Sequence, residues 1–203
     1  MTKNISKVTI KELPVSVCEP APLGLIGLAV AALVLGIHDM GWLSSSLDKS
    51  MMIPWTLCLG ATAQLIAGIM DFKRKNIFGA TAFTAYSLMW YSVSITLIIS
   101  IFTKADYNLD HYAIGLIGFL IFSLILTVAT LMLNKTLFGI LVFIDLAILA
   151  LVLHILIDTQ AIFVGVPLLV VSALSFYGAA GGLLNTMAGK PILPMGKALW
   201  VPK

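Results

Sequence analysis

The stretch EPAPLGLIGLAV, residues 19–30, opens the first long apolar run of this 203-residue sequence. A carboxylate and two prolines stand directly in front of that run. Proline is tolerated in the first turn of a helix, because its missing N–H would have no intrahelical partner there. An acidic side chain is favourable at the same helix end. The stretch therefore predicts that an apolar helix begins at Pro20, with Glu19 just outside it.

The overall composition places such a helix in lipid. The sequence is 60% hydrophobic and 10% charged, and its mean hydropathy is +1.07. A soluble domain has too little polar surface to cover so many apolar side chains. The net charge of +3 is modest and does not indicate a nucleic-acid partner. We therefore expect a membrane protein.

Apolar runs of near-spanning length recur along the whole chain. A hydrocarbon core of about 30 Å requires about 20 apolar residues. Six runs qualify, at 21–38, 52–70, 78–102, 112–133, 137–157 and 161–188. The sequence therefore predicts an all-α membrane protein with six transmembrane helices. These form one transport domain, residues 19–188, between a polar tail at 1–18 and a C-terminal tail at 189–203.

The basic residues predict the orientation of these helices. One side of the membrane would hold ten of them, namely Lys3, Lys7, Lys11, Lys73, Arg74, Lys75, Lys135, Lys190, Lys197 and Lys203, and the other side only Lys49 and Lys104. Such a bias predicts that both termini lie in the cytoplasm. Residues 1–18 contain no apolar core, so we expect no cleaved signal peptide.

Signatures of enzymes are missing from the sequence. Its three histidines are far apart, and no zinc, nucleophile-elbow or phosphate-loop motif occurs. Cys18 and Cys58 provide neither a disulfide framework nor metal-ligand spacing. We therefore expect no enzyme activity, no metal and no cofactor.

One charged side chain, Asp145, falls well inside an apolar run. An intramembrane carboxyl group is costly and normally faces the helix bundle or water. Two interpretations stay open for it. Asp145 is either a proton site or polar lining of a pathway, or it is a hydrogen-bonded group at a contact between helices.

Uncharged polar side chains gather in the second, third and sixth runs. Phe83, Tyr86 and Trp90 follow helical spacing and share one face of the third run. Tyrosine mixed with threonine and serine indicates a narrow wet path or a helix contact. The small residues of 178–182 favour close helix packing.

Three separated blocks of the sequence resemble conserved regions of a known family. PAPLGL at 20–25, AQLIAGIMDFKRKNIFGATAFTAYSLMW at 63–90 and SFYGAAGGLLNTMAGKPILPMG at 175–196 resemble the conserved regions of the acetate uptake transporter family, which includes bacterial succinate–acetate permeases. The resemblance implies six helices per protomer, a ring-shaped homo-oligomer (a hexamer in known members), and one pore per protomer in the cytoplasmic (inner) cell membrane. The implied partners are acetate, small carboxylates such as succinate, protons and membrane lipids, and no nucleic acid.

The resemblance also implies which residues form the pore. The family has a constriction of phenylalanine, tyrosine and leucine, for which the matching positions are Leu28, Tyr86 and Leu146. Ser175 matches a position linked to substrate preference. The expected substrate-binding or pore residues are Pro20, Ala21, Pro22, Leu23, Leu25, Gln64, Thr84, Tyr86, Ser175 and Asn185. Leucine at position 28 predicts a wider or differently shaped constriction.

Glu19 departs from the family, which has asparagine at this position. An ionised glutamate repels acetate, so four interpretations stay open. Glu19 points to the cytoplasm, is protonated when substrate passes, belongs to an entrance that works differently, or is an ordinary interface charge. Glu19 and Asp145 are thus the candidate proton sites. The predicted function is proton-coupled transport of acetate. The alternatives are an uncoupled acetate channel and a non-transporting scaffold or sensor.

Overall fold

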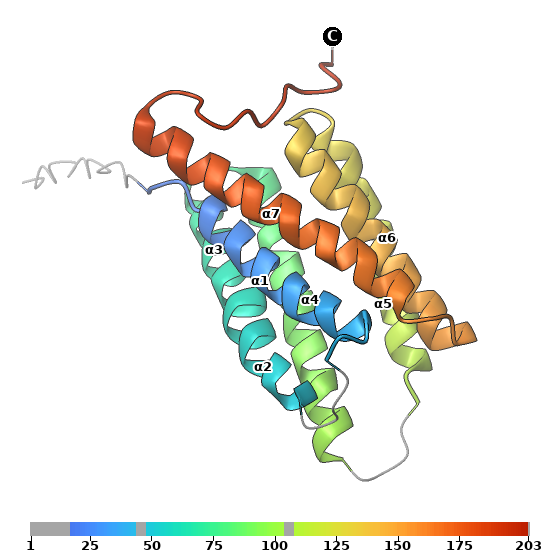
Figure 1. Cartoon of the computed structure of the whole chain (residues 1–203). Coiled ribbons are helices and arrows are strands. Elements are labelled where there is room, and N and C mark those ends of the chain that lie inside the picture. Colours follow the sequence, from blue (N-terminus) through green and yellow to red (C-terminus); the bar gives the residue numbers. More distant parts are fainter. Residues whose placement is uncertain (1–16, 44–47, 104–107, 203) are drawn as a thin grey trace, which may run out of the picture.

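The computed structural model describes residues 17–43, 48–103 and 108–202, and all regular structure in these ranges is helical. The long helices form one bundle (Figure 1). In chain order the elements are α1 (Ala21–Asp39), η1 (Asp48–Met51), α2 (Met52–Trp55), η2 (Thr56–Ala63), α3 (Gln64–Lys73), α4 (Ile77–Phe102), α5 (Asp110–Thr130), α6 (Lys135–Ile157) and α7 (Ile162–Ala188).

Six stretches are long and apolar enough to cross a membrane, as the sequence predicts. They are Ala21–Asp39, Lys49–Lys73, Ile77–Phe102, Asp110–Thr130, Lys135–Ile157 and Ile162–Ala188. The second of them is assembled from η1, α2, η2 and α3. Its central part, η2, is a π-helix of 8 residues, which the sequence analysis did not predict. Such wide turns interrupt α-helices most often at functional sites.

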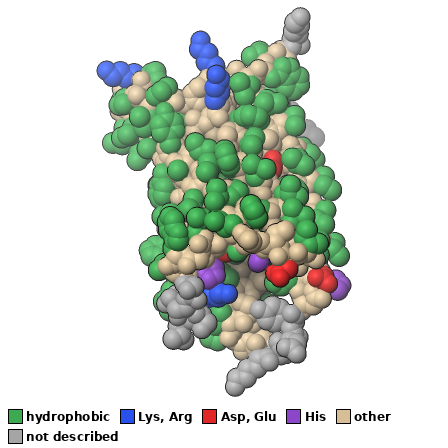
Figure 2. All heavy atoms as spheres, turned by 45° about the vertical axis from the view of Figure 1, so that its right-hand side comes forward, with side chains coloured by type: hydrophobic (Ala, Val, Ile, Leu, Met, Phe, Trp, Pro, Cys, Tyr) green, Lys and Arg blue, Asp and Glu red, His purple; other side chains and the backbone are tan. Residues whose placement is uncertain are grey.

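Most charged side chains lie at the two ends of the bundle, and the belt between them is mainly hydrophobic, with one acidic side chain visible in it (Figure 2). We call the end with Lys73, Arg74, Lys75, Lys135, Lys190 and Lys197 the basic end. The described chain begins and ends at this basic end (Figure 1). This distribution fits the predicted orientation, although the cytoplasmic location of the basic end stays a prediction. Lys3, Lys7, Lys11, Lys104 and Lys203 lie outside the described residues.

Local capping explains where several helices begin and end. Asn134 Oδ1 accepts a hydrogen bond of 2.9 Å from the backbone N–H of Leu137 at the start of α6. Asn76 caps α4 in the same way through Gly79. At its other end α6 stops at Asp158, and α7 stops at Gly189, both in left-handed conformation. The short connection at Asn134 makes α5 and α6 antiparallel neighbours.

Glycine allows α1 to pack closely on both sides. Gly27 lies against the backbone carbonyl of Leu59 in η2, where a Cβ atom would collide with the oxygen. Gly36 lies beside Gly165 of α7. Such small-residue contacts let helix backbones approach in a membrane. They place α1 at the centre of the bundle, between α7 and the second span.

The segment after α7 crosses the basic end of the bundle as a strap (Figure 1). We define the C-terminal strap as residues 189–202. Tyr177 Oη donates to the carbonyl of Pro194 at 2.7 Å. The backbone N–H and the hydroxyl of Thr136 both donate to the carbonyl of Met195. Leu199 and Trp200 donate their N–H groups to the carbonyl of Leu131. The strap therefore connects α7 to the turn between α5 and α6.

Candidate functional site

A small cavity lies inside the bundle between α1, α4, α5, α6 and α7. Its volume is about 50 Å³, which is room for one or a few water molecules. None of its lining side chains carries a charge, and the polar atoms among them are those of Tyr86 and Trp90. A group that enters this cavity must therefore shed water against an apolar wall.

Two of the three predicted constriction residues meet at this cavity. Leu28 of α1 and Tyr86 of α4 both line it and are only 6% and 4% exposed. The ring of Tyr86 also packs edge-on against Phe119 of α5, with 5.3 Å between the ring centroids. Leu28 and Tyr86 thus lie in the wall of the same cavity, and their role as a constriction stays a prediction.

The third predicted constriction residue, Leu146, lies elsewhere. Its side chain is 46% exposed on the outer face of α6. The α6 side chains that line the cavity are instead Ile144, Ala147, Ile148 and Leu151. These positions share one helical face, and position 146 falls on the opposite face. The rotation of α6 about its axis therefore points these four side chains toward the cavity and Leu146 away from it.

Behind Tyr86 runs a chain of hydrogen bonds that ends at Asp145. The hydroxyl oxygens of Tyr86 and Ser123 lie 2.6 Å apart, and Ser123 is hydrogen-bonded to Asp145 Oδ1. Thr127 Oγ1 lies 2.6 Å from Asp145 Oδ2. The carboxyl group of Asp145 is therefore both hydrogen-bonded at a helix contact and connected to the cavity. Sequence reasoning missed Ser123 and Thr127, although their spacing of four residues marks one face of α5.

Predicted polar residues of the second and third spans come together between α3 and α4. Gly60 packs against Trp90, and Gly68 packs against Thr84. Gln64 lies midway between the two glycines along its helix, one turn from each, so it faces α4 between Thr84 and Trp90, near Ser87. Gln64 is 1% exposed, and neither its amide oxygen nor its amide nitrogen has a hydrogen-bond partner among the described residues.

The hydroxyls of Thr84, Ser87 and Ser175 are likewise buried without a partner in the described part of the chain. Buried polar groups are nearly always hydrogen-bonded, and each orphan costs about 1–3 kcal/mol. These atoms are therefore available to water or to a polar solute. Ser87 belongs to the mixture of tyrosine, threonine and serine that the sequence shows in the third run.

The PAPLGL stretch forms the basic-end part of α1. Pro20 and Leu25 are buried, Ala21 and Pro22 are partly buried, and Leu23 is exposed. Pro22 contacts Gly182 of α7, and no residue of 20–25 lines the central cavity. If these residues contact a solute, they do so at the basic end rather than at mid-depth.

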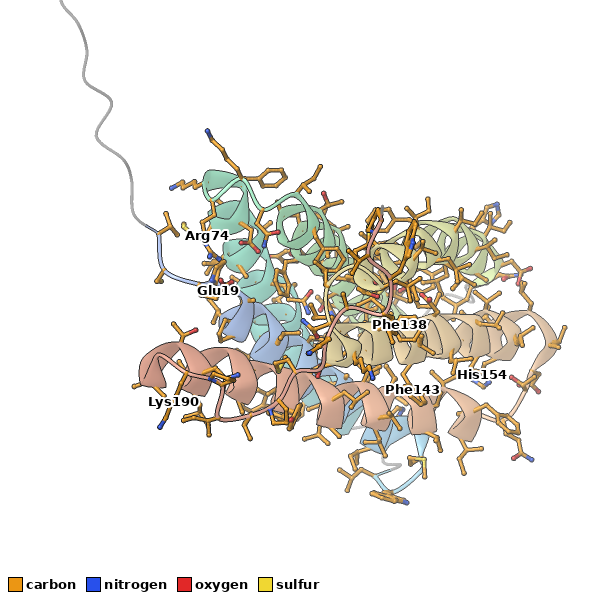
Figure 3. The ribbon with its side chains drawn as sticks, turned by 90° about the horizontal axis from the view of Figure 1, so that it is seen from above. Glu19, Arg74, Phe138, Phe143, His154 and Lys190 are labelled. Carbon is orange, nitrogen blue, oxygen red and sulfur yellow. The ribbon has the colours of Figure 1, made fainter. Side chains whose placement is uncertain are left out.

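Glu19 is held by an ion pair at the same end (Figure 3). Arg74 Nη1 lies 2.7 Å from Glu19 Oε1 and 3.4 Å from Asp71 Oδ1. The hydrogen bond from Arg74 lowers the pKa of Glu19, against the opposing effect of its partial burial. The same pair raises the pKa of Arg74. Glu19 is therefore ionised and neutralised by its neighbour, which favours a structural role over that of a proton carrier.

Asn185 has a different role from the predicted one. Its amide oxygen accepts from the N–H groups of Ile192 and Leu193, at 2.6 and 2.8 Å. Its amide nitrogen donates to the carbonyl of Leu193 at 2.8 Å. The side chain thus folds the C-terminal strap back onto α7 and does not line the cavity.

No group of three His, Cys, Asp or Glu side chains suited to a metal occurs within residues 17–43, 48–103 and 108–202. The structure therefore offers an apolar cavity, with Tyr86 in its wall bonded to Ser123 behind it, and buried polar atoms without partners elsewhere in the described bundle. This arrangement is suited to passing a small solute and offers no reactive group for chemistry.

Comparison with known proteins places the chain in a family, because the profile of the GPR1/FUN34/yaaH family matches residues 6–195. The chain belongs to the GPR1/FUN34/yaaH family. This is a transporter family, and the chain is not an enzyme.

Two named relatives and one solved structure that resemble this chain have acetate in their names. The chain is 31% identical over 186 residues to the protein of Escherichia coli K12 named succinate-acetate/proton symporter SatP, covering 88% of this chain and 95% of that protein. It is 29% identical to acetate permease A of Emericella nidulans, over 65% of this chain and 47% of that protein. It also resembles the solved structure described as that of the bacterial acetate channel SatP, with a TM-score of 0.82 and 28% identity, over 89% of this chain and all of that one.

Proposed function

We propose that this protein carries acetate, and other short carboxylates such as succinate, across a membrane through a pathway in each protomer. The observation that carries the proposal is that Leu28 and Tyr86 line the same apolar cavity inside a bundle with a SatP-like fold. A cavity of about 50 Å³ admits only a small solute, and its wall suits the methyl end of acetate.

The surroundings of the cavity support passage of an anion. None of the lining side chains is charged, so no permanent cation holds a carboxylate too tightly to release it. Neutral donors can replace part of the water that the carboxylate loses, as in other selective pores. The buried amide of Gln64 and the hydroxyls of Thr84 and Ser175 lack partners in the described structure. We assign them this role.

Orientation and assembly complete the proposal. The basic end lies in the cytoplasm, and the protein lies in the cytoplasmic membrane as a multi-pass protein. One face of α5 exposes a row of large apolar side chains, Ile114, Ile117, Ile121, Leu124, Ile125 and Val128. Lipid or neighbouring protomers cover such a face. By resemblance to the family, the protomers form a ring, expected to be a hexamer.

The test is uptake of labelled acetate into liposomes that contain the purified protein. A pH gradient and a membrane voltage are imposed in separate experiments, and empty liposomes measure the leak of neutral acetic acid. Protein-dependent uptake driven by the pH gradient identifies a proton symporter. Uptake that follows voltage alone identifies a channel, which the similarity to the acetate channel structure makes the second candidate. Absence of uptake by folded protein contradicts the proposal and favours a scaffold.

A further inference from the structure

The carboxyl group of Asp145 is connected to the cavity only through hydroxyl groups. The connection runs from Tyr86, which lines the cavity, through Ser123 to Asp145 Oδ1. All three side chains are buried, and Ser123 is fully so. Hydroxyl groups both donate and accept, so such a chain can carry its hydrogens in either direction.

Ser123 and Thr127 can form hydrogen bonds with the carboxyl group of Asp145 in both of its charge states. When it is ionised, Ser123 donates to Oδ1 and Thr127 donates to Oδ2. When Oδ1 carries a proton, it donates to Ser123 Oγ, while Thr127 still donates to Oδ2. The change of charge therefore requires only the rotation of the hydroxyl groups of Ser123 and Tyr86.

The far side of Asp145 offers no route for ions. There the side chain borders a groove of about 350 Å³ between α5 and α6, whose other lining side chains, apart from Thr127, are apolar. In a membrane such a groove is covered by lipid tails or by a neighbouring protomer. Protons therefore reach Asp145 from the cavity side.

Among the residues that the structure describes, no other charged group faces Asp145. Tyr86 of α4 is the titratable side chain that faces it, and α5 faces it with Ser123 and Thr127. The single titratable residue of α7, Tyr177, bonds the C-terminal strap. On α6 itself, Lys135 and His154 are nine or ten residues away, about 13–15 Å along the helix.

We propose that Asp145 is a proton-binding site, and that its charge state decides whether the Tyr86 hydroxyl offers the cavity a hydrogen-bond donor or only an acceptor. The inference rests on the proposed function and adds the residue that binds the proton. With Asp145 ionised, Tyr86 donates to Ser123 and Ser123 donates to Asp145. With Oδ1 protonated, Asp145 donates to Ser123, Ser123 donates to Tyr86, and the Tyr86 hydrogen turns to the cavity.

The two directions have opposite consequences for acetate. A neutral Asp145 together with a donating Tyr86 accommodates a carboxylate. An ionised Asp145 repels a second negative charge in this poorly screened interior, and Tyr86 offers it no donor. The proton and the anion therefore favour each other's binding, and this effect is reciprocal by linkage.

The proton transfer along this chain is balanced. Acetic acid in the cavity gives its proton to Tyr86 Oη, the former Tyr86 proton passes to Ser123 Oγ, and the former Ser123 proton passes to Asp145 Oδ1. Acetic acid becomes acetate and the carboxylate becomes a carboxylic acid, while each hydroxyl keeps one hydrogen. No oxidant, reductant or further reactant takes part.

The first measurement does not depend on transport. Infrared spectra of the protein are recorded in detergent or lipid between about pH 4 and pH 9, a range that covers ordinary and strongly shifted carboxyl groups. A protonated-carboxyl C=O band that titrates in this range and disappears in Asp145→Asn is the expected result. Identical titration of the protein and of this variant overturns the proposal, even if acetate is transported.

The second measurement compares the initial rates of acetate uptake driven by a pH gradient and by a voltage. In Asp145→Asn and in Ser123→Ala the ratio of the two rates is expected to fall about tenfold, within the usual range for coupled sites. Ser123→Ala leaves the hydrogen bond from Thr127 to Asp145 intact. It provides the test by itself if Asp145→Asn does not fold. An unchanged ratio in folded variants overturns the proposal.

The matched control is Ser94→Ala. Ser94 is a fully buried hydroxyl of α4 whose bonds go to Thr56 and to the Trp90 carbonyl, without connection to Asp145. Its removal is expected to leave the ratio of rates unchanged, and an equal fall in this control contradicts the assigned relay. If the unaltered protein moves no acetate at all, the proposed function fails, while the infrared titration still decides whether Asp145 binds a proton.

Discussion

Arg74 joins two carboxylates of different elements, because its Nη1 atom lies 2.7 Å from Glu19 and 3.4 Å from Asp71. Glu19 precedes α1 and Arg74 follows α3, so the pair fixes the entry of the chain against the turn before α4 (Figure 3). The negative charge that would repel an anion at this entrance is thereby balanced.

This ion pair predicts a pH dependence of stability. The pKa of Glu19 is lowered in the folded protein by the hydrogen bond from Arg74. Its contribution is therefore present above the unfolded pKa and lost as the pH falls through the folded pKa. Because both side chains are partly exposed, the contribution is below about 1 kcal/mol. Thermal melting of the detergent-solubilised protein at pH 7 and at pH 4 should differ less in Glu19→Gln than in the unaltered protein. A larger difference in the variant contradicts this assignment.

The phase of α6 predicts unequal effects of two neighbouring substitutions. Ile148 is buried at the cavity and Leu146 is 46% exposed. Ile148→Ala should cost about 2–5 kcal/mol in stability and change the preference between acetate and succinate. Leu146→Ala should leave uptake unchanged and cost little. Competition of unlabelled carboxylates against labelled acetate uptake measures the preference, and a selectivity change in Leu146→Ala alone would restore the sequence-based assignment.

The size of the cavity predicts the effect of restoring an aromatic ring at position 28. Leu28→Phe adds volume to a space of about 50 Å³, so larger carboxylates should suffer more than acetate. We expect the ratio of succinate to acetate uptake to fall several-fold, which corresponds to about 1 kcal/mol of added packing strain. A ratio that stays constant or rises in folded protein shows that the narrowest point lies elsewhere.

The tetrapeptide Gly-Leu-Ile-Gly occurs twice in the sequence, and the structure predicts different tolerance of the two copies. A Cβ atom at Gly27 would collide with the Leu59 carbonyl, whereas nothing lies within 4 Å of such an atom at Gly115. Gly27→Ala should therefore destabilise the protein or prevent folding, while Gly115→Ala should be harmless or slightly stabilising in its helix. Size-exclusion profiles and melting temperatures in detergent compare the two. Equal melting temperatures would contradict the close contact of α1 with η2.

The sequence predicted the six spans well, because each apolar run reports directly on burial in lipid. It predicted the rotation of the helices poorly. In α6 nearly every residue is apolar, so nothing in the pattern distinguishes the face of Ile148 from that of Leu146. On α4 the helical spacing of Phe83, Tyr86 and Trp90 defines one face, and Tyr86 and Trp90 of that face line the cavity. Asn185 was misassigned because its partners are backbone groups of the C-terminal strap, which no side-chain pattern reveals.

The π-helix η2 and the chain from Tyr86 to Asp145 were beyond sequence reasoning for a related reason. Wide helical turns depend on how Leu59 and Gly60 pack against α1 and α4, not on a local motif. In the sequence Ser123 and Thr127 are ordinary residues of an apolar helix, and only the packing of α5 on α6 brings them beside Asp145.

The C-terminal strap has a consequence for the order in which the molecule is completed. The carbonyl of Leu131, at the end of α5, is bonded by Leu199 and Trp200, which leave the ribosome after all six spans have been made. The turn between α5 and α6 therefore stays unfinished while the six spans are inserted and closes only after Leu199 and Trp200 have been made. A ribosome that stops before Leu199 would release six inserted helices with this turn still open.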